Sequence, residues 1–552
     1  MRRSFLRACV GCAAAASSGG SALSALAAQA RAASSAAPAA GRIDPAFALA
    51  DVRLLPGPFL DAQQTDRAYL LALDPDRLLA PFRREAGLAQ PKPSYGNWES
   101  SGLDGHMGGH YLSALAMMAA STGDEAIRHR LSVFLSALRA CQLANKDGYL
   151  GGIPDGRTAW RDVARGELKV DSFSVNGRWV PWYNLHKTFA GLRDAWLIGG
   201  EPLARTMLLD LCDWAQRLLA PLSDVQLQDM MRAEHGGMNE VFADVARMTG
   251  DARYLRLAER FSHRAILDPL REGRDALTGL HANTQIPKVI GFARIAEARG
   301  QDAGAEAEAE AEWLAPARTF WKTVRERRSV AIGGNSVKEH FHPLTDFQPM
   351  LDEVEGPETC NTYNMLKLTE ILHAHTRDDS ERAAYADYHE RALFNHILAS
   401  QHPGGGFVYF TPMRPQHYRV YSQVHEGMWC CVGSGLESHA RHGQFIYTRR
   451  RHRDDALPTV HVNLFIASKL TWDDEGIALT QRTRFPDEPR TQIRIDRGGR
   501  FTLKIRHPGW VAAGALRVRI NGQPSTIYST PGSYIALTRE WTADDLVDVR
   551  LP

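Results

Sequence analysis

The sequence predicts a multidomain α+β protein, with an (α/α)6 barrel over residues 43–405 followed by an antiparallel β-sandwich over residues 406–552. Two observations predict it. From about residue 60 to 400, apolar residues recur at i, i+3, i+4 and i+7 between loops rich in Gly, Pro and Asp, which is the period of amphipathic helices. After residue 405 the period changes to two, and β-branched residues become frequent.

The first 33 residues read as an export signal rather than as part of the fold. They combine an Arg-rich start, an Ala-rich middle and small residues around Ala28-Gln29-Ala30, as a cleaved signal needs. Arg2-Arg3 followed by Phe5-Leu6 fits the twin-arginine variety, with an ordinary secretory signal as the alternative. The protein is therefore expected to be periplasmic or secreted. After Gly41 no apolar run reaches about 18 residues, so no membrane span is expected.

Several helix-forming stretches of the barrel domain share one pattern. Each begins in a polar loop, runs through small and apolar residues, and stops at a Gly or Asp turn. They lie at 110–124, 186–200, 239–251, 287–302 and 363–379. The spacings leave room for one further helix between successive copies, so the repeating unit is a helical hairpin. Hairpins that close into a barrel would gather the polar N-terminal loops of the inner helices at one end, whereas an open helical solenoid is the alternative.

The C-terminal region reads as a series of short strands. TVHVNLFIASKLTW, FTLKIRHP and ALRVRINGQ alternate between apolar and polar residues and are separated by Gly, Pro and Asp turns. This pattern favours an antiparallel β-sandwich. The final VDVRLP itself reads as part of a strand, so the C-terminal domain is not necessarily complete here.

Overall charge and composition restrict the partners. The 552-residue chain is 44% hydrophobic and 23% charged, and its net charge is +2. It shows no dense Lys/Arg stripe interleaved with aromatic residues, so nucleic acid is not expected as a partner. A large polar or neutral substrate fits, and the oligomeric state is left open.

The cysteines divide into two groups. Two of the seven lie in the export signal, and the remaining odd number in so large a chain argues against a disulfide framework. Cys141 and Cys212 lie on helical apolar periods and are expected to be core thiols. Cys360, Cys430 and Cys431 need another explanation.

A metal site is one such explanation. Adjacent cysteines rarely bond to each other, because the small ring strains the peptide between them, but two thiolates can share one ion. Glu358 and Cys360, just before a helix expected to start near Asn361, point the same way if the segment is extended. With Cys430 and Cys431 they make a tetrahedral set suited to zinc (Zn2+). A structural zinc, a redox thiol pair or three unrelated buried cysteines would leave much the same pattern.

Around these residues the sequence resembles glycoside hydrolase family 127 and, more closely in CCVGSG and GGNSVKEHFHP, its relative family 146. The likeness spans nearly all the mature chain and is most specific at 333–343, 355–368 and 428–441. It implies an (α/α)6 barrel with a β-sandwich and a retaining β-L-arabinofuranosidase that uses a zinc-held cysteine. Carried over residue by residue, it makes Cys430 the nucleophile and Glu339 the general acid/base, and it places the zinc ligands on Glu358, Cys360, Cys430 and Cys431.

Further polar residues are candidates for binding the sugar. The resemblance places His186 and His281 at positions where the family contacts sugar hydroxyls. The segments 95–110 and 233–240 offer a further lining: Trp98, Glu99, Asp104, His106, His235 and Glu240. Each of these polar groups has a structural alternative as a helix cap or a satisfied buried group, and Trp98 either stacks on a sugar or fills the core.

Two departures from the family 127 pattern concern specificity. Met428-Trp429 stands where some relatives carry a third cysteine, and the 19 residues from Glu339 to Glu358 leave room for an insertion beside the site. The expected function is release of β-L-arabinofuranosyl units, by retention, from an arabinose-containing oligosaccharide, plant glycan or glycoprotein. The alternatives are a glycosidase of the same fold for another pectic side-chain sugar, a non-catalytic zinc-containing glycan-binding protein, and a thiol redox protein.

Overall fold

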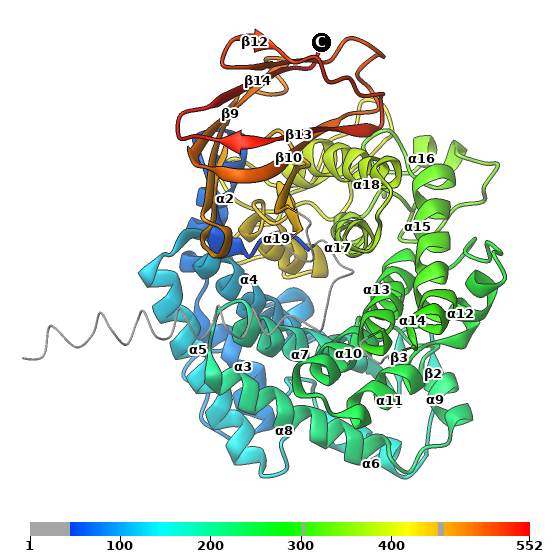
Figure 1. Ribbon diagram of the computed structural model, residues 1–552. Helices are drawn as coiled ribbons and strands as arrows, with labels where there is room; N and C mark the ends of the chain where they lie inside the picture. The colour runs from blue at the N-terminus through cyan, green and yellow to red at the C-terminus, as the bar shows by residue number, and fades with distance from the viewer. Residues whose placement is uncertain (1–44, 301–303, 451–456) are drawn as a thin grey trace, which may run out of the picture.

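The computed structural model describes residues 45–300, 304–450 and 457–552, which form a helical part and a strand part (Figure 1). The expected export signal, residues 1–33, lies outside the described residues. Within the described ranges, no helix combines the length and the apolar character that crossing a membrane would need.

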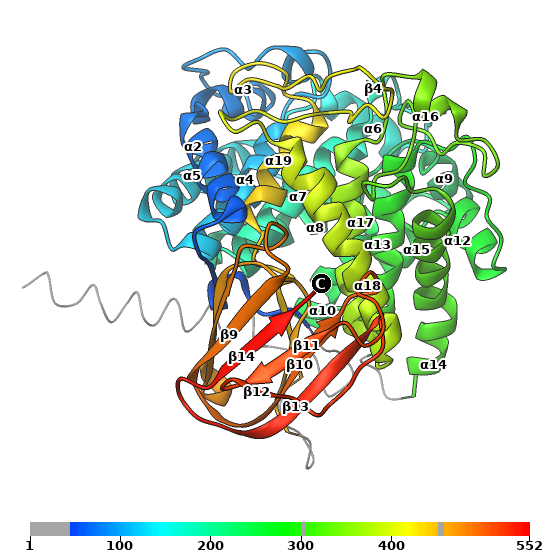
Figure 2. The same ribbon diagram turned by 90° about the horizontal axis from the view of Figure 1, so that it is seen from above.

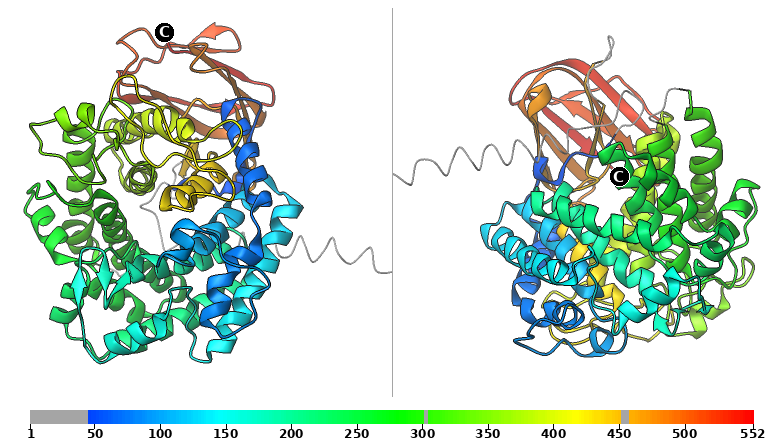
Figure 3. Two further views of the ribbon diagram at one scale, coloured as in Figure 1. Left: turned by 180° about the vertical axis from the view of Figure 1, so that it is seen from behind. Right: turned by 90° about the horizontal axis from the view of Figure 1, so that it is seen from below.

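The inner layer of the helical part is a ring of helices that pack side by side (Figures 1 and 3). Each packs on the next, and the last packs back on the first, so the arrangement differs from an open solenoid. These helices are buried on most sides, and all eleven residues of the last one are buried. In order they are α4 (His106–Thr122), α7 (Pro181–Leu197), α10 (Met238–Thr249), α13 (Ala282–Arg299), α17 (Thr359–His375) and α19 (Cys430–Ala440).

Each inner helix packs against one outer helix, and five of these six pairs are the helical hairpins that the sequence predicted. The outer partners, in the same order, are α5 (Glu125–Asn145), α8 (Pro202–Leu219), α11 (Ala252–Arg260), α15 (Ala315–Arg327), α18 (Asp379–Ala392) and α2 (Pro58–Ala72). The first five follow their inner helix in the chain, whereas α2 precedes α19 by most of the sequence. Shorter helices fill the connections: α3 (Pro75–Glu85), α6 (Gly156–Ala164), α9 (Asp224–Met230), α12 (Arg264–Arg271), α14 (Glu306–Ala309) and α16 (Gln348–Asp352).

Glycines allow α4 and α7 to approach closely. A Cβ atom on Gly109 would lie 2.2 Å from the carbonyl carbon of Lys187, and one on Gly191 would lie 2.7 Å from the carbonyl oxygen of Gly109. Any larger residue would push the two backbones apart. This contact fixes the relative position of the two helix starts, from which several site residues project.

The strand part is a sandwich of two sheets, ordered β1-β7-β8-β9-β14-β11-β12 and β13-β10-β6-β5. All pairings within these sheets are antiparallel except that of β6 with β10, which is parallel. The strand β1 comes from the N-terminal segment and pairs with β7. The strands are β1 (Val52–Leu54), β5 (Tyr447–Arg450), β6 (Thr459–Val462), β7 (Ser468–Trp472), β8 (Ile477–Thr483), β9 (Arg490–Arg497), β10 (Gly499–His507), β11 (Arg517–Ile520), β12 (Gln523–Pro524), β13 (Ser533–Trp541) and β14 (Leu546–Arg550).

The structure corrects the domain boundary expected at residue 405. Helix α19 lies beyond that point but belongs to the inner ring, and the C-terminal strands begin only at Tyr447. The change of pattern near residue 405 instead marks a long loop that returns to the ring. A small sheet of β2 (Val170–Asp171), β3 (Ser174–Val175) and β4 (Arg178–Trp179), which the sequence did not predict, lies within the helical part.

Charged side chains join the sandwich to the ring, beside α18 (Figure 2). Arg506 of β10 is fully buried and pairs with Asp387 and Glu390 of α18. Nearby, Lys504 Nζ lies 2.7 Å from Asp379. Removing one member of such a buried pair leaves an uncompensated charge. These contacts therefore restrict the orientation of the sandwich relative to the ring.

A buried network of ion pairs ties four inner helices together. Arg193 of α7 lies 3.0 Å from both Glu240 and Asp244 of α10. Lys367 of α17 lies 3.2 Å from Glu240, and Arg294 of α13 lies 3.0 Å from Asp244. Each carboxylate thus has two cationic neighbours on different helices, which makes the network specific to this arrangement of the ring.

Lys288 of α13 is buried, and within the described residues it forms no ion pair with a carboxylate. Its Nζ lies 3.0 Å from Nδ1 of His263 and 3.4 Å from the carbonyl oxygen of Met231. Burial lowers the pKa of Lys288 to about 7. In an unfolded chain a lysine has a pKa of about 10.4.

This difference predicts a pH-dependent stability. Between about pH 7 and pH 10 the unfolded chain binds a proton at Lys288 that the folded chain does not, so the free energy of unfolding rises with pH. The rise is at most roughly 1.4 kcal/mol per pH unit. Denaturant unfolding at pH 7 and pH 9.5 measures the effect. The free energy of unfolding of wild type, relative to that of the Lys288→Met variant, should be higher at pH 9.5 than at pH 7. An unchanged difference between the two proteins would show that Lys288 titrates normally.

Candidate active site and metal centre

The starts of the inner helices carry most of the predicted site residues. His106 begins α4 and His186 lies in the second turn of α7. His281 is the N-cap of α13, Glu358 is the N-cap of α17, and Cys430 begins α19. The sequence predicted that these loops would gather at one end of the ring, and the contacts described below join them.

The four predicted metal ligands form one buried cluster. One possible ligand atom from each of Glu358, Cys360, Cys430 and Cys431 lies within 4.8 Å of the others. Sγ of Cys360 lies 3.1 Å from Sγ of Cys431 and 3.1 Å from Oγ of Ser434. Sγ of Cys430 lies 3.9 Å from both Oε1 of Glu358 and Sγ of Cys431.

Two neighbouring helix N-termini create this cluster. Glu358 is extended, as predicted, but α17 already begins at Thr359, so Cys360 lies in its first turn and not in an extended segment. The two side chains still meet because the N-cap and the first turn project toward the same end of the helix. Cys430 and Cys431 open α19, which packs on α17. The positive end of a helix dipole favours ionised thiols and carboxylates at both positions.

Burial opposes the ionisation of three of the four groups in the cluster. Burial raises the pKa of Glu358, Cys430 and Cys431 well above their ordinary values. Burial also acts to raise the pKa of Cys360, but hydrogen bonds from Cys430 and Cys431 outweigh it and lower that pKa to about 7.

The described residues supply neither a positive charge nor a full set of hydrogen-bond partners for Glu358. Among the described residues, Glu358 forms no ion pair with an Arg or Lys, and its buried Oε2 has no hydrogen-bond partner. Four acidic groups therefore share a buried space without a fixed positive charge. Three thiols and one carboxylate are a donor set that suits zinc.

Glu339 lies beside this cluster on a constrained loop. Its φ is +65°, a conformation that few non-glycine residues adopt. The backbone is held because Ala282 N–H donates to the carbonyl of Glu339 at 2.7 Å and Lys338 N–H donates to that of Glu355 at 2.8 Å. The surrounding structure thus supports a strained residue, as is common at functional sites.

Two neighbours orient the carboxylate of Glu339. The hydroxyl of Tyr409 donates a hydrogen bond to Oε1, and Nε2 of His281 lies 3.6 Å from Oε2. Nδ1 of His281 accepts from Thr284 N–H at 3.2 Å, which places the proton of a neutral ring on Nε2, toward Glu339. Burial acts to raise the pKa of Glu339, but the interactions with His281 and Tyr409 outweigh it and lower that pKa.

Cys430 and Glu339 both lie next to Glu358. His281, Glu339 and Glu358 each place one possible ligand atom within 4.8 Å of the others, and Cys430 contacts Glu358 as described. The side chain of Glu339 is 30% exposed, whereas Glu358 is only 1% exposed. A thiol and an accessible carboxyl group thus meet at one site, which is what displacement with proton transfer needs.

Aromatic residues form a wall next to the cysteines. Trp98 packs against the cysteine cluster and edge-on to Trp179, with ring centres 5.1 Å apart. Its ring centre also lies 5.8 Å from that of Tyr409 and 6.4 Å from that of His106. Half-buried aromatic faces of this kind can stack on a sugar ring and keep water from the thiols.

Three of the predicted lining carboxylates are engaged by the fold. Glu99 accepts backbone N–H bonds from Gly105 at 3.0 Å and Met107 at 2.8 Å, so it caps the start of α4. Asp104 accepts from Arg84 at 2.9 Å. Glu240 belongs to the ion-pair network of the ring, whose positive charges, against the opposing effect of burial, hold its pKa below the ordinary range. These groups position the helix starts.

The predicted histidines differ in their surroundings. His186 packs so tightly on the glycine pair at 236–237 that a Cβ on Gly236 would lie 2.5 Å from its Nδ1. Both ring nitrogens of His186 are buried, and within the described residues neither has a hydrogen-bond partner. His235 packs edge-on to Phe261 with ring centres 5.3 Å apart, which is a core contact. His106 places Nδ1 2.8 Å from the carbonyl oxygen of Leu103.

The structure adds site residues that the sequence did not single out. Tyr409 is one, because its segment read only as a strand, and Tyr183, which packs on the cysteines, is another. Ser434 follows Cys430 by four residues, a helical spacing that could have predicted its contact with the cluster. Glu234 is buried nearby, and its charge acts to raise the pKa of Glu358.

Comparison with known families covers most of the chain. Residues 51–444 match the family model of the β-L-arabinofuranosidase GH127 catalytic domain. Residues 459–552 match that of the β-L-arabinofuranosidase GH127 middle domain. No curated protein matches the sequence.

Solved structures show the same fold at low sequence identity. A GH127 β-L-arabinofuranosidase from Geobacillus stearothermophilus T6 is 17% identical with a TM-score of 0.68, over 91% of this chain and 81% of that one. A GH127 β-arabinofuranosidase is 18% identical with a TM-score of 0.69, over 92% and 80%. A third, described as a glycoside hydrolase, is 16% identical with a TM-score of 0.67, over 93% and 78%.

The cluster predicts a dependence of metal content on Cys360. Purified wild type should contain about one zinc ion per chain, and the Cys360→Ala variant much less, because a three-ligand site holds the ion less tightly. Elemental analysis measures the content, and thermal unfolding with and without a chelator measures the stabilisation. Cys141→Ala, which removes a buried thiol elsewhere, is the control and should keep its zinc. Equal zinc in all three proteins would exclude Cys360 as a ligand.

Proposed function

The chain belongs to glycoside hydrolase family 127, the β-L-arabinofuranosidase family, and on this premise we propose that it releases β-L-arabinofuranosyl units from plant glycans or glycoproteins with retention of configuration. The observation that carries the proposal is the meeting of Cys430 and Glu339 at one site, beside a buried cluster of metal-binding type. We interpret the ring of inner and outer helices as an (α/α)6 barrel, with this site at the N-terminal ends of the inner helices.

The cluster fits a zinc ion held by Glu358, Cys360, Cys430 and Cys431. Such an ion would keep the thiol of Cys430 ionised and would make it a better leaving group. The chain supplies the remaining requirements. Burial by Trp98, Tyr183 and Tyr409 limits the access of water to the thiols, and the start of α19 aims Cys430 toward the space next to Glu339.

The first half of the reaction transfers the sugar to the protein. The sulfur of Cys430 attacks the anomeric carbon and forms a C–S bond as the glycosidic C–O bond breaks. This step needs the protonated form of Glu339, although His281 and Tyr409 lower the pKa of its carboxyl group. Glu339 gives its proton to the departing oxygen, so the aglycone leaves as an alcohol. Glu339 is then an ionised carboxylate, and the hydroxyl of Tyr409 stabilises that form by its hydrogen bond.

The second half releases the sugar. Glu339 takes a proton from a water molecule, the water oxygen attacks the anomeric carbon, and the C–S bond breaks with its electrons returning to Cys430. Two displacements at one carbon give net retention. His281 and Tyr409 hold Glu339 in position through both steps, and the unpartnered nitrogens of His186 are placed to bind sugar hydroxyls.

We also propose that the protein acts outside the cytoplasm, in the periplasm or after secretion. The support is the signal-like sequence of residues 1–33. A twin-arginine signal would deliver the chain already folded, with its thiols protected from oxidation by coordination.

Hydrolysis of p-nitrophenyl β-L-arabinofuranoside tests the function. Wild type should release p-nitrophenol, and Cys430→Ala should lose nearly all activity because it has no nucleophile. Glu339→Gln should lose roughly 10²–10⁴-fold in rate, the usual contribution of general acid–base catalysis. Cys141→Ala should match wild type, and NMR of the first-formed sugar should show the β anomer.

Other outcomes would redirect the assignment. Folded, zinc-loaded wild type that fails on this substrate but hydrolyses another aryl glycoside would keep the mechanism and change the sugar. Binding of glycans with no turnover of any would favour a non-catalytic role. An α anomer as the first product would exclude the double displacement through Cys430.

A further inference from the structure

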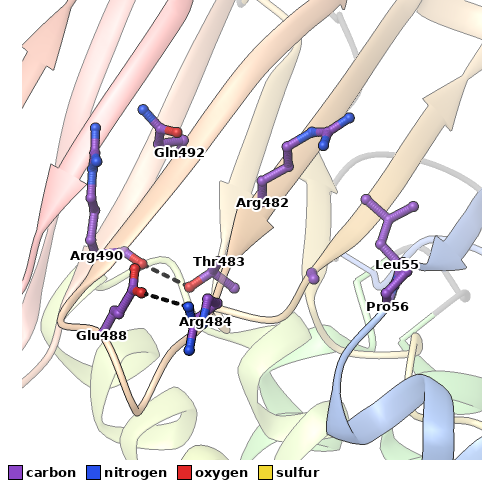
Figure 4. Close-up of a pocket in the computed structure, with 9 residues that line it drawn as sticks. Leu55, Pro56, Arg482, Thr483, Arg484, Glu488, Arg490 and Gln492 are labelled. Carbon is purple, nitrogen blue, oxygen red and sulfur yellow. Dashed lines mark hydrogen bonds and ion pairs between the residues drawn. The ribbon is translucent and has the colours of Figure 1, made fainter.

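A pocket of about 380 Å³ lies on the β-sandwich, and none of its lining residues belongs to the cysteine cluster (Figure 4). Strands β8 and β9 supply much of its wall, including Arg482, Arg490 and Gln492. Figure 4 shows these three side chains on one side of the sheet. Leu55, from the segment after β1, adds an apolar surface.

The pocket carries more positive charge than the fold neutralises. Arg484 pairs with Glu488 at 3.2 Å, and Arg490 Nε donates to Asp548 at 2.9 Å. Arg482 forms no ion pair within the described ranges. It is exposed on the outer face of the sheet, where Gln492 is its cross-strand neighbour. The pocket therefore offers a guanidinium group that has no partner of its own.

The positive charge continues across the sheet beyond the pocket. Arg490 of β9 lies opposite Arg550 of β14, and Arg550 lies opposite Arg517 of β11. In the adjacent row, Arg519 lies opposite Asp548. Like charges in direct cross-strand register destabilise a sheet, and one aspartate does not balance these arginines.

These arginines lie outside the core of the sandwich. The inward residues of the same strands, such as Ile493 and Val547, are fully buried and form the sandwich core. The arginines alternate with them and point outward. A row of like charges kept at an energetic cost, next to a pocket with an unpaired arginine, indicates a ligand of opposite charge.

We propose that this face binds the carboxylate groups of an acidic polysaccharide that contains uronic acids. Arginine forks match carboxylates in geometry as well as charge. The amide nitrogen of Gln492 donates to Asp548 at 3.1 Å, and its amide oxygen can accept a hydrogen bond from a sugar hydroxyl. Leu55 offers a surface to the C–H face of a sugar. The pocket lining contains no aromatic side chain on which a nucleic acid base could stack, which favours a glycan.

The proposal goes beyond the catalytic centre and stands independently of it. A polysaccharide whose acidic backbone is bound to the sandwich would carry its neutral sugar branches close to the active site of the same protein molecule. The local concentration of these branches near the active site would therefore rise. Binding at the sandwich is measured directly, so a failed arabinofuranosidase assay would not decide it.

Calorimetric titration of the full chain with an oligogalacturonate tests the site. Wild type should bind, and the affinity should fall as salt is added. The double variant Arg482→Gln/Arg550→Gln should bind about tenfold more weakly, the effect of about 1.4 kcal/mol. Neither of these arginines forms an ion pair within the described part of the chain, so the change leaves no carboxylate unpartnered. Arg500→Gln, on β10 of the other sheet, is the matched control and should bind like wild type, because Arg500 is also exposed and forms no ion pair within the described residues.

Several results would overturn the proposal. The proposal is wrong if wild type does not bind the oligogalacturonate or if the double variant binds it as tightly as wild type does. It is also wrong if wild type binds a carboxyl-reduced oligosaccharide equally well. Tighter binding of a single-stranded oligonucleotide than of the uronate would assign the face to nucleic acid instead. Hydrolysis of an aryl glycoside and thermal unfolding should be the same in all variants, which separates a lost site from a lost fold.

Discussion

The structure depends most on the burial of four acidic side chains at one point. Glu358, Cys360, Cys430 and Cys431 meet where two helices of the ring begin, and within the described residues no Arg or Lys forms an ion pair with Glu358 there. Burying ionised groups without compensation is costly, so such a cluster is stable only when its groups stay protonated or share a cation. The two helix N-termini lower the cost of the ionised form and direct all four groups inward.

The ring makes this arrangement possible because its helices start at one end. Glycine contacts hold α4 and α7 together, and ion pairs tie α7, α10, α13 and α17 below the site. The charged network compensates itself, whereas the cysteine cluster does not. The same ring therefore contains two kinds of buried polar group. The ion-pair network, in which opposite charges neutralise each other, supports the fold, whereas the acidic groups of the cysteine cluster are suited to chemistry.

Glu339 shows how the site combines rigidity with access. Its loop holds a left-handed backbone through hydrogen bonds to the start of α13, and His281 and Tyr409 fix its carboxylate from two sides. It is nevertheless more exposed than Glu358, the proposed metal ligand beside it. An acid/base must meet both substrate and water, whereas a ligand such as Glu358 is best kept from both.

The amino-acid sequence predicts the features that depend on local spacing. The helical and strand periods predicted the two kinds of structure, and the spacing of Glu358 and Cys360 with the adjacent pair predicted the cluster. Glu339 came only from the resemblance to a family. Tertiary structure decided which segments meet: α19 joins the ring although it lies beyond the expected boundary, and Tyr409 reaches Glu339 across 70 residues of sequence. It also decided that Glu99, Asp104 and Glu240 have partners in the fold, and that arginines from three strands stand in register. Such contacts join residues far apart in the chain, and no local period encodes them.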